Sequence, residues 1–248
     1  MEVRSVGIIG DGQFGRFLAS LAREHIHASV IVAPKGDDAA LRAAAACDVV
    51  VLCVPISAYE SVAKAIAPHL GERTIVCDIA TVKMHTVQAL RDAGITRFIS
   101  THPMFGPYSY EKHGKSLRGL RIALCETALD PGEREQVAAW LSSLGLAVLE
   151  LSPEAHDKLI AETLFLTHLV GQVVHRGGFE RTEIDTVSFG YLMDAVESVA
   201  HDEALFRDVF RYDPYCTDVL ARFEQTRSDV VSGLERSGHD RGPIARGL

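Results

Sequence analysis

His102 is the residue whose type and surroundings most directly suggest acid–base chemistry. It stands in the run STHPMFGPYSY (residues 100–110), which has no charged residue. A neutral imidazole, with a pKa of about 6.5, can accept a proton from a substrate hydroxyl as hydride leaves the same carbon. Pro103 and Pro107 would stiffen the stretch, and Gly106 would let the backbone approach a substrate. The residue types leave two interpretations open, a catalytic base and a turn histidine bonded to backbone.

A second group of candidate functional residues is a set of glycines near the amino end, in VGIIGDGQFGRF (residues 6–17). They have the GxGxxG spacing, directly after an apolar run and directly before a helical pattern. Glycines in this position allow a tight turn, close approach of a pyrophosphate and close helix packing, while the helix amino end offers free N–H groups. The alternative is a glycine turn without a ligand. The predicted cofactor-binding residues are Gly10, Gly12, Gln13, Phe14, Gly15, Lys35 and Pro55.

Lys35 bears on the choice of cofactor. The residue that contacts the 2′ position of the cofactor ribose is expected about 20 positions after the glycine loop. The sequence has Ala33, Pro34 and Lys35 there, where NAD enzymes usually present Asp or Glu. The missing acid removes an acceptor for the 2′-hydroxyl, and Lys35 could face a 2′-phosphate, so NADP is favoured over NAD. If the strand is longer than predicted, Asp37 or Asp38 could instead be the acid that binds the ribose 2′-hydroxyl.

A Rossmann-type scaffold is predicted to position these residues. Between residues 4 and 151, short β-branched runs alternate with amphipathic stretches, which indicates a parallel sheet with helices on each side. His102 follows the fifth run, so we expect it on a loop at the carboxyl edge of the sheet, where such sheets bind ligands. The predicted strands are residues 5–10, 29–33, 48–54, 74–78, 97–100, 121–125 and 147–151.

The pattern changes after Ser152, from which only helical spacing is found. Ser152 is a plausible N-cap with Pro153 at the first helical position. We therefore predict a dinucleotide-binding α/β domain over residues 1–151 and an all-helical substrate and dimerisation domain over residues 152–248. The helices are more apolar than one small bundle requires, so a homodimer is expected to cover part of them.

Composition narrows the class of partner and the compartment. The 248 residues carry 25 Lys and Arg against 33 Asp and Glu, a net charge of −8, without a basic run, which argues against nucleic-acid binding.

The longest apolar stretch, residues 47–56, is shorter than the about 20 residues of a membrane span. With no room for a signal peptide before the first strand, a cytoplasmic location is expected. The five cysteines lack CxxC spacing and are interpreted as buried thiols, not as disulfides or metal ligands.

Several motifs together resemble the prephenate and arogenate dehydrogenases of tyrosine and aromatic amino acid biosynthesis. The hallmark is THPMFGP, residues 101–107, and the resemblance covers nearly the whole chain. It is nearest to short arogenate-type enzymes, in which no regulatory domain is expected. The other motifs, in the family's order, are GDGQFG (10–15), CDIATVK (77–83), SPEAHD (152–157), FLTHLVGQ (165–172) and an NPY-like segment, LFRDVFRYDPY (205–215).

The resemblance implies oxidative decarboxylation of a cyclohexadienol. His102 would take the proton of the ring 4-hydroxyl, hydride would pass from that carbon to the nicotinamide, and the ring carboxylate would leave as CO2. Thr81, where the family usually has serine, would orient the substrate or His102, and His168 would reach the substrate from the helical domain. An N-cap role for Thr81 and a satisfied core position for His168 stay open. For His156 and Asp157, capping and helix-dipole chemistry is at least as good an interpretation as catalysis.

Two departures from the family pattern favour arogenate, or an amino-bearing analogue, over prephenate. Glu197 stands where many prephenate-specific members carry an arginine that grips a carboxylate, and an acid could instead pair with the ammonium of arogenate. HLVG, residues 168–171, replaces the HLPH of prephenate enzymes. Prephenate dehydrogenase activity, giving 4-hydroxyphenylpyruvate, stays an alternative. The candidates for the ring carboxylate, with surface ion pairing as their alternative, are Arg176, Arg207 and Arg211.

Two other functional classes are compatible with the architecture. β-Hydroxyacid dehydrogenases and imine or pyrroline reductases also join a Rossmann domain to a helical one, and Lys158 is available as the lysine on which the first group depends. The THPMFGP stretch has no place in that chemistry. The other class is a sensor that binds NADP without turnover, against which the complete histidine loop argues.

Overall fold

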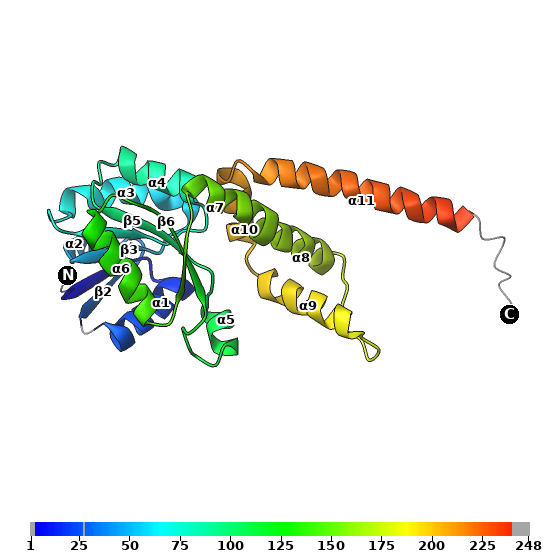
Figure 1. Cartoon of the computed structure of the whole chain (residues 1–248), viewed down its shortest axis with the longest axis horizontal. Coiled ribbons are helices and arrows are strands. Elements are labelled where there is room, and N and C mark those ends of the chain that lie inside the picture. The colour runs from blue at the N-terminus through cyan, green and yellow to red at the C-terminus, as the bar shows by residue number, and fades with distance from the viewer. Residues whose placement is uncertain (1–2, 27, 240–248) are drawn as a thin grey trace.

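The computed structural model describes residues 3–26 and 28–239 and contains a seven-stranded sheet of order β2-β1-β3-β4-β5-β6-β7 (Figure 1). All seven predicted strands are present, and the Rossmann-type α/β fold is confirmed. The strands are β1 (Ser5–Ile9), β2 (Ser29–Ala33), β3 (Val49–Leu52), β4 (Ile75–Asp78), β5 (Phe98–Pro103), β6 (Arg121–Thr127) and β7 (Ala147–Glu150).

The sheet is mixed at one edge, where a wholly parallel sheet was predicted. It is parallel from β2 to β5, but β6 is antiparallel to β5, and β7 runs parallel to β6. Parallel neighbours need a connection that crosses the sheet, usually through a helix. The segment between β5 and β6 instead holds the short helix α5 (Pro107–Lys112), which packs beside α1 and does not cross the sheet. The predicted long loop after His102 therefore contains a helix.

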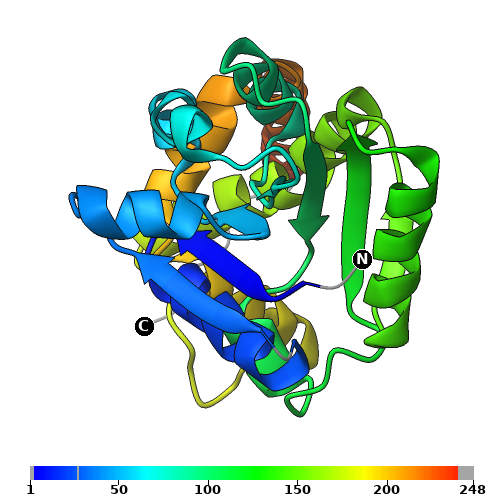
Figure 2. The same ribbon diagram turned by 90° about the vertical axis from the view of Figure 1, so that its left-hand side faces the viewer.

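Helices cover both faces of the sheet (Figure 2). One face carries α2 (Asp38–Ala45), α3 (Tyr59–Ile66) and α4 (Lys83–Asp92), which pack against one another in that order. The other carries α1 (Gln13–His25) and α6 (Pro131–Ser143), and two short 3-10 turns, η1 (Ile56–Ala58) and η2 (Ala67–His69), flank α3.

The helical part begins at Pro153, with the Ser152 hydroxyl accepting a hydrogen bond from the Ala155 N–H at 3.1 Å, as an N-cap does. No strand follows β7 in the described residues. The bounds of the helices are α7 (Pro153–Ile160), a π-helical turn η3 (Ala161–Phe165) that continues into α8 (Leu166–Arg176), then α9 (Val187–Val199), α10 (Glu203–Tyr212) and α11 (Cys216–His239).

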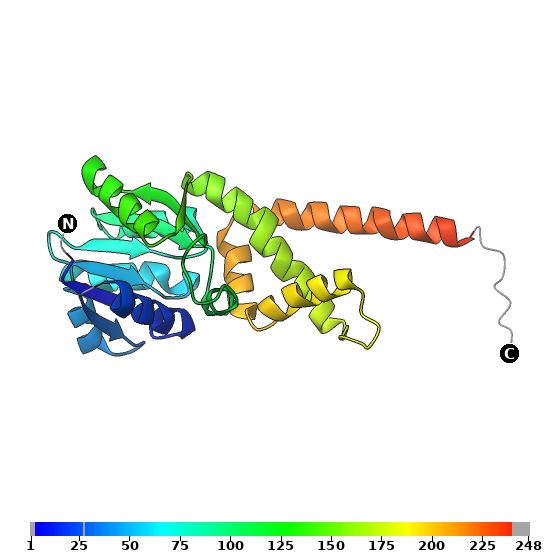
Figure 3. The same cartoon turned by 60° about the horizontal axis from the view of Figure 1, so that its bottom comes forward.

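The helical part lies at the carboxyl edge of the sheet and shares its core. One hydrophobic cluster joins Val50 and Leu52 of the sheet with Phe165 and Val209 of the helices. The segments η1 and α4, which follow β3 and β4, pack against α10 and α7. The long helix α11 extends away from the rest of the molecule (Figures 1 and 3). The two predicted parts are therefore continuous in packing, which fixes α7 over the ends of the strands.

Among the described residues, no helix is long and apolar enough to cross a membrane, and no group of three potential metal-ligating side chains is found. All five cysteines are free thiols.

Candidate active site

His102 lies inside β5, one residue before its end, and not on the loop that follows. The predicted strand end at Ser100 is wrong because the antiparallel pairing with β6 continues through His102, opposite Ala123, to Pro103. The side chain is only 6% exposed. Burial, to which the nearby Lys83 ammonium adds, holds the pKa of His102 well below its ordinary value, so the imidazole is neutral at pH 7.

His156 contacts His102 directly, which the sequence did not predict. Nδ1 of His102 lies 3.0 Å from Nε2 of His156, and Nδ1 of His156 lies 2.8 Å from Oδ1 of Asp157. Asp157 also accepts hydrogen bonds from the N–H groups of Lys83 and Met84, both at 2.8 Å. Asp157 therefore does not cap its own helix α7, as the alternative interpretation had it, but binds the first N–H groups of α4. The available sequence signal was the adjacent His and Asp in SPEAHD.

Asp78 organises a second buried network beneath β5. It accepts hydrogen bonds from Lys83 Nζ and Ser100 Oγ, each at 2.7 Å. Lys83 also donates to the carbonyl of Thr101 at 2.6 Å, one residue before His102. This network fixes the strand that carries His102. The sequence did not predict this network, because Thr81 was the one candidate in CDIATVK.

Thr81 occupies a half-buried bend between β4 and α4. Val82, and not Thr81, is the N-cap residue of α4, so the capping alternative is wrong. Within the described part of the chain, no hydrogen bond joins the Thr81 side chain to His102. Its role in orienting the substrate stays a prediction.

His168 is buried in α8 with one nitrogen unpaired. Its ring is 4% exposed and stacks on Phe206 at a centroid distance of 6.1 Å. Nδ1 has no hydrogen-bond partner, so His168 is not a satisfied core histidine. Burial lowers the pKa of this imidazole, opposed by Asp202, and the neutral ring leaves Nδ1 available to a ligand.

The π-helical turn aligns His156 and His168. On a regular α-helix, residues 156 and 168 would point about 120° apart. A π-turn absorbs one extra residue, which brings them to within about 20° of each other, as in an 11-residue helical repeat. Both side chains are buried. The π-turn thus gives the continuous helix one inward histidine-bearing face.

Glu197 lies on the exposed side of α9, away from these contacts. Its carboxylate accepts a hydrogen bond from Arg181 Nε at 2.7 Å, and this bond lowers the pKa of Glu197. Lys112 of α5 is near enough to add to that lowering. No described contact joins Glu197 to His102, so its pairing with a substrate ammonium stays a prediction.

The candidate arginines lie on the surface. Arg176 and Arg207 both pair with Glu203, and Arg211 lies over the ring of Tyr212 at 5.2 Å. Arg176 and Arg207 therefore form surface ion pairs, which was the alternative to binding the ring carboxylate. Gly106, by contrast, is the N-cap of α5, and a side chain there would meet open space.

Lys158 does not have the surroundings of a catalytic lysine. Its side chain is 54% exposed, and Nζ lies 2.7 Å from Oε1 of Glu154. That hydrogen bond raises the pKa of the ammonium, which opposes action as a base. The geometry gives no support to chemistry of the β-hydroxyacid dehydrogenase type.

The glycine loop has the shape of a pyrophosphate cradle. Gly10 has a φ of +110°, and a Cβ there would lie 2.2 Å from the Cys53 carbonyl oxygen. A Cβ at Gly15 would lie 2.1 Å from the Gly10 oxygen, whereas at Gly12 it would meet nothing within 4 Å. Gly12 is the N-cap of α1 and supplies no side-chain cap, so the first N–H groups of that helix, beginning at Gln13, are free for an anion.

Lys35 is the residue predicted to face the cofactor ribose. β2 ends at Ala33, so Lys35 lies just beyond the strand and is exposed. The Asp37 carboxylate caps α2, accepting from the Ala40 N–H at 2.9 Å. Pro55 follows β3, at the turn beside the glycine loop. A nicotinamide dinucleotide fits these residues, with its pyrophosphate at the start of α1.

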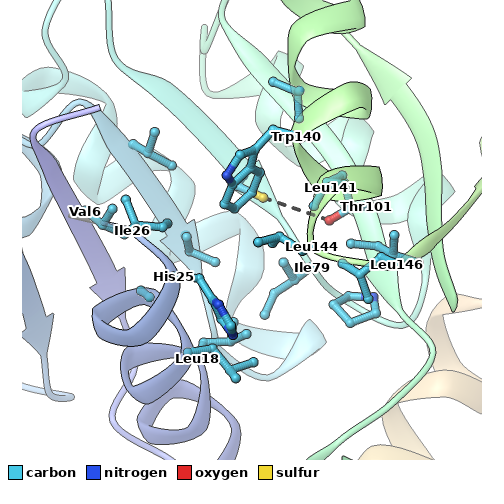
Figure 4. A pocket seen from close by; sticks show the side chains of 18 of the residues that line it. Val6, Leu18, His25, Ile26, Ile79, Thr101, Trp140, Leu141, Leu144 and Leu146 are labelled. Carbon is cyan, nitrogen blue, oxygen red and sulfur yellow. Dashed lines mark hydrogen bonds between the residues drawn. The ribbon is translucent and has the colours of Figure 1, made fainter. Parts of the chain in front are cut away.

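A cavity of about 620 Å³ lies between α1 and α6, on the face of the sheet that these two helices cover (Figure 4). Its lining is almost wholly apolar; the strongly polar side chains in it are His25, Thr101 and Gln136. Side chains alternate along a strand, so Thr101 faces this cavity while His102 faces α7. An apolar cavity does not suit a dinucleotide or a carboxylate-bearing substrate, so the candidate site is at His102.

Known proteins share both sequence and fold with this chain. The family model described as prephenate dehydrogenase, nucleotide-binding domain, matches residues 21–148. The chain is 29% identical to arogenate dehydrogenase 2, chloroplastic, and 28% identical to arogenate dehydrogenase 1, chloroplastic, both of Arabidopsis thaliana. Each match covers 92% of this chain, with 69% of the first relative and 40% of the second.

Similarity of fold extends to a solved structure. The crystal structure of prephenate dehydrogenase from A. aeolicus, in complex with hydroxyphenyl propionate and NAD+, superposes with a TM-score of 0.74 at 20% identity. The superposition covers 96% of this chain and 93% of that one. With the match of the family model over more than half of the residues, the chain belongs to the prephenate dehydrogenase family of oxidoreductases.

Proposed function

We propose that the chain catalyses the NADP-dependent oxidative decarboxylation of arogenate to tyrosine. The observation that carries the proposal is His102, a buried neutral imidazole at the carboxyl end of β5 with one nitrogen held by His156. Its other nitrogen, Nε2, makes no hydrogen bond within the described part of the chain and is the proton acceptor.

The reaction balances with His102 as base. The O–H bond of the ring 4-hydroxyl breaks and its proton goes to Nε2, while the C4–H bond gives hydride to the nicotinamide when that cofactor is bound. The bond to the ring carboxylate breaks, CO2 leaves, and its electron pair completes the aromatic ring. The proton then returns from His102 to the phenolate oxygen, which gives the phenol of the product. A positioned base contributes about 10²–10⁴ in rate, and the remainder comes from alignment of the ring with the cofactor.

Preference for NADP is part of the proposal. Lys35 is exposed directly after β2, where it meets a 2′-phosphate. Asp37, which could have read a 2′-hydroxyl, already accepts the N–H of Ala40. The glycine loop, with Gln13 and Phe14 at the start of α1, holds the pyrophosphate.

Arogenate is proposed over prephenate for two reasons. The two Arabidopsis relatives are named arogenate dehydrogenases, and the residues that depart from the prephenate pattern are Glu197 and HLVG. In this proposal Glu197 exchanges Arg181 for the substrate ammonium, and the unpaired Nδ1 of His168 binds a substrate oxygen. Prephenate or an amino-substituted analogue is the alternative substrate.

A cytoplasmic homodimer completes the proposal. Its support is a set of exposed apolar side chains on the helical part, which a second copy would cover. They include Val173 on α8, Val187 and Tyr191 on α9, and Val230 and Leu234 on α11.

The test is the rate of NADPH and NADH formation with arogenate and with prephenate. Wild type is expected to turn over arogenate with NADP, and His102→Asn to lose about 10²–10⁴ of kcat while still binding cofactor. Glu197→Arg is expected to raise kcat/KM for prephenate relative to arogenate. Cofactor binding without turnover of either substrate by the wild type would contradict the proposal.

A further inference from the structure

We infer that His156, held by Asp157, is a positioning residue that keeps the proton of neutral His102 on Nδ1 and so leaves the lone pair on Nε2. The inference rests on the proposed function, because it specifies which nitrogen of the base faces the substrate. It assigns a role to two residues for which the sequence pattern left both helix capping and catalysis open.

Asp157 only accepts hydrogen bonds, and this fixes the direction of its bond to His156. Its Oδ1 accepts from the Lys83 N–H and its Oδ2 from the Met84 N–H, at the start of α4. A carboxylate held by backbone donors on both oxygens has only acceptor capacity to offer. Nδ1 of His156, 2.8 Å from Oδ1, must therefore donate. Both side chains are at most 2% exposed, so water does not compete for these groups.

The direction at His156 then sets the direction at His102. We take His156 as neutral in this inference, and a neutral imidazole that donates from Nδ1 has an acceptor at Nε2. Nε2 of His156 lies 3.0 Å from Nδ1 of His102, so His102 donates from Nδ1. The proton of neutral His102 is thereby assigned to Nδ1, and Nε2 keeps its lone pair. The other tautomer of His102 would set two acceptors against each other at 3.0 Å.

The surrounding charges are consistent with this arrangement. The charged groups nearest the pair are Lys83 from α4 and Asp157 on α7. Lys83 is itself neutralised by Asp78 of β4, and Asp213, in the turn between α10 and α11, is near enough to Asp157 to interact with its charge. When His102 takes a proton, the Asp157 carboxylate, acting through His156, is the counter-charge on that side. Such carboxylate–imidazole pairs orient and strengthen a base in hydrolases and metal sites.

The direct test is ¹⁵N NMR of histidine-labelled protein without substrate. The His102 ring signals are assigned by their loss in His102→Asn. In wild type at pH 8 we expect Nδ1 to give the signal of a protonated nitrogen and Nε2 that of an unprotonated one. In His156→Leu the two forms should become mixed. A protonated Nε2 in neutral wild-type His102 would overturn the inference.

The kinetic test uses two matched substitutions of His156. Glutamine is long enough to place an amide oxygen where Nε2 lies and can accept from His102, whereas asparagine is too short. We expect His156→Gln to keep kcat within about tenfold of wild type and His156→Asn to lose about 10–100-fold, with KM little changed. The acid limb of the kcat/KM profile should move in His156→Asn and not in His156→Gln.

The two tests separate this inference from the proposed function. Equal loss in both variants with an unchanged His102 tautomer would show a merely structural role and overturn the inference, while the reaction stands. If the wild type turns over neither substrate, the NMR signals still decide the tautomer, and only the reaction fails. Thermal midpoints of each variant identify any that do not fold.

Discussion

The ammonium of Lys83 lies 2.7 Å from Oδ2 of Asp78, and both side chains are completely buried. Asp78 also accepts from Tyr59, Thr86, Ser100 and the Ala80 N–H, while Lys83 donates to the Thr101 carbonyl. The ion pair is thus fully hydrogen-bonded, which is the condition under which buried charges are tolerated. It joins β4, α4 and β5 directly beneath His102.

Removing one partner of this pair should destabilise the fold strongly. Lys83→Met leaves the Asp78 carboxylate buried without a counter-charge, which costs about 3–5 kcal/mol in free energy of unfolding. The matched control is Lys158→Met, because Lys158 pairs with Glu154 at an exposed site where ion pairs contribute little to stability. Urea unfolding measures both, and equal losses would contradict the role of the buried pair.

Local pattern was enough to predict the strands, the glycine turn before the first helix and the Ser152 cap. The direction of β6 was not predictable, because it depends on α5 packing beside α1 and not crossing the sheet. The contact between His102 and His156 joins residues 54 positions apart, and no local periodicity encodes it. The π-turn that aligns His156 with His168 leaves no clear residue signal either.

Asp213 should make stability depend on pH. Its carboxyl is 1% exposed, with Oδ2 unpaired, and burial raises its pKa from 3.8 to about 6. A raised acid pKa gives stability that is full below the unfolded value and lost as pH rises through about 6. Asp213→Asn, which cannot ionise, should raise the free energy of unfolding by about 1–3 kcal/mol at pH 8. At pH 4 the two proteins should differ little in thermal midpoint; a difference of the same size at both pH values would refute the assignment.

Gly12 and Gly10 should respond differently to alanine. Gly12→Ala adds a methyl group to open space at the start of α1, so the protein should fold but bind NADPH at least tenfold more weakly. Gly10→Ala forces a Cβ against the Cys53 oxygen at a φ of +110°, so its thermal midpoint should fall as well. Cofactor fluorescence titration and thermal unfolding separate the two effects. Unchanged NADPH affinity in Gly12→Ala would place the pyrophosphate elsewhere.

Lys35→Ala should weaken binding of NADPH and leave NADH unaffected. The exposed ammonium after β2 is expected to meet only the 2′-phosphate, and a charge-assisted hydrogen bond of this kind contributes about 1.5–3 kcal/mol. The ratio of dissociation constants for NADH and NADPH should therefore fall by about tenfold or more. Lys64→Ala, on α3, is the control for a general loss of positive charge. An equal change for both cofactors would contradict discrimination by Lys35.

Leu234→Glu should convert a dimer into monomers. Leu234 is 68% exposed and Val230 59% exposed, one helical turn apart on α11, which extends away from the rest of the molecule (Figure 3). An apolar stripe on a projecting helix is unfavourable in water, and a second copy of the chain can bury it, together with the exposed residues of α8 and α9. A carboxylate in that stripe would be desolvated without a partner.

Leu149→Glu is the control, because Leu149 is also exposed, at 40%, but lies on β7. Light scattering after size exclusion should show a dimer for wild type and Leu149→Glu and a monomer for Leu234→Glu; a monomeric wild type would mean that the stripe serves a different contact.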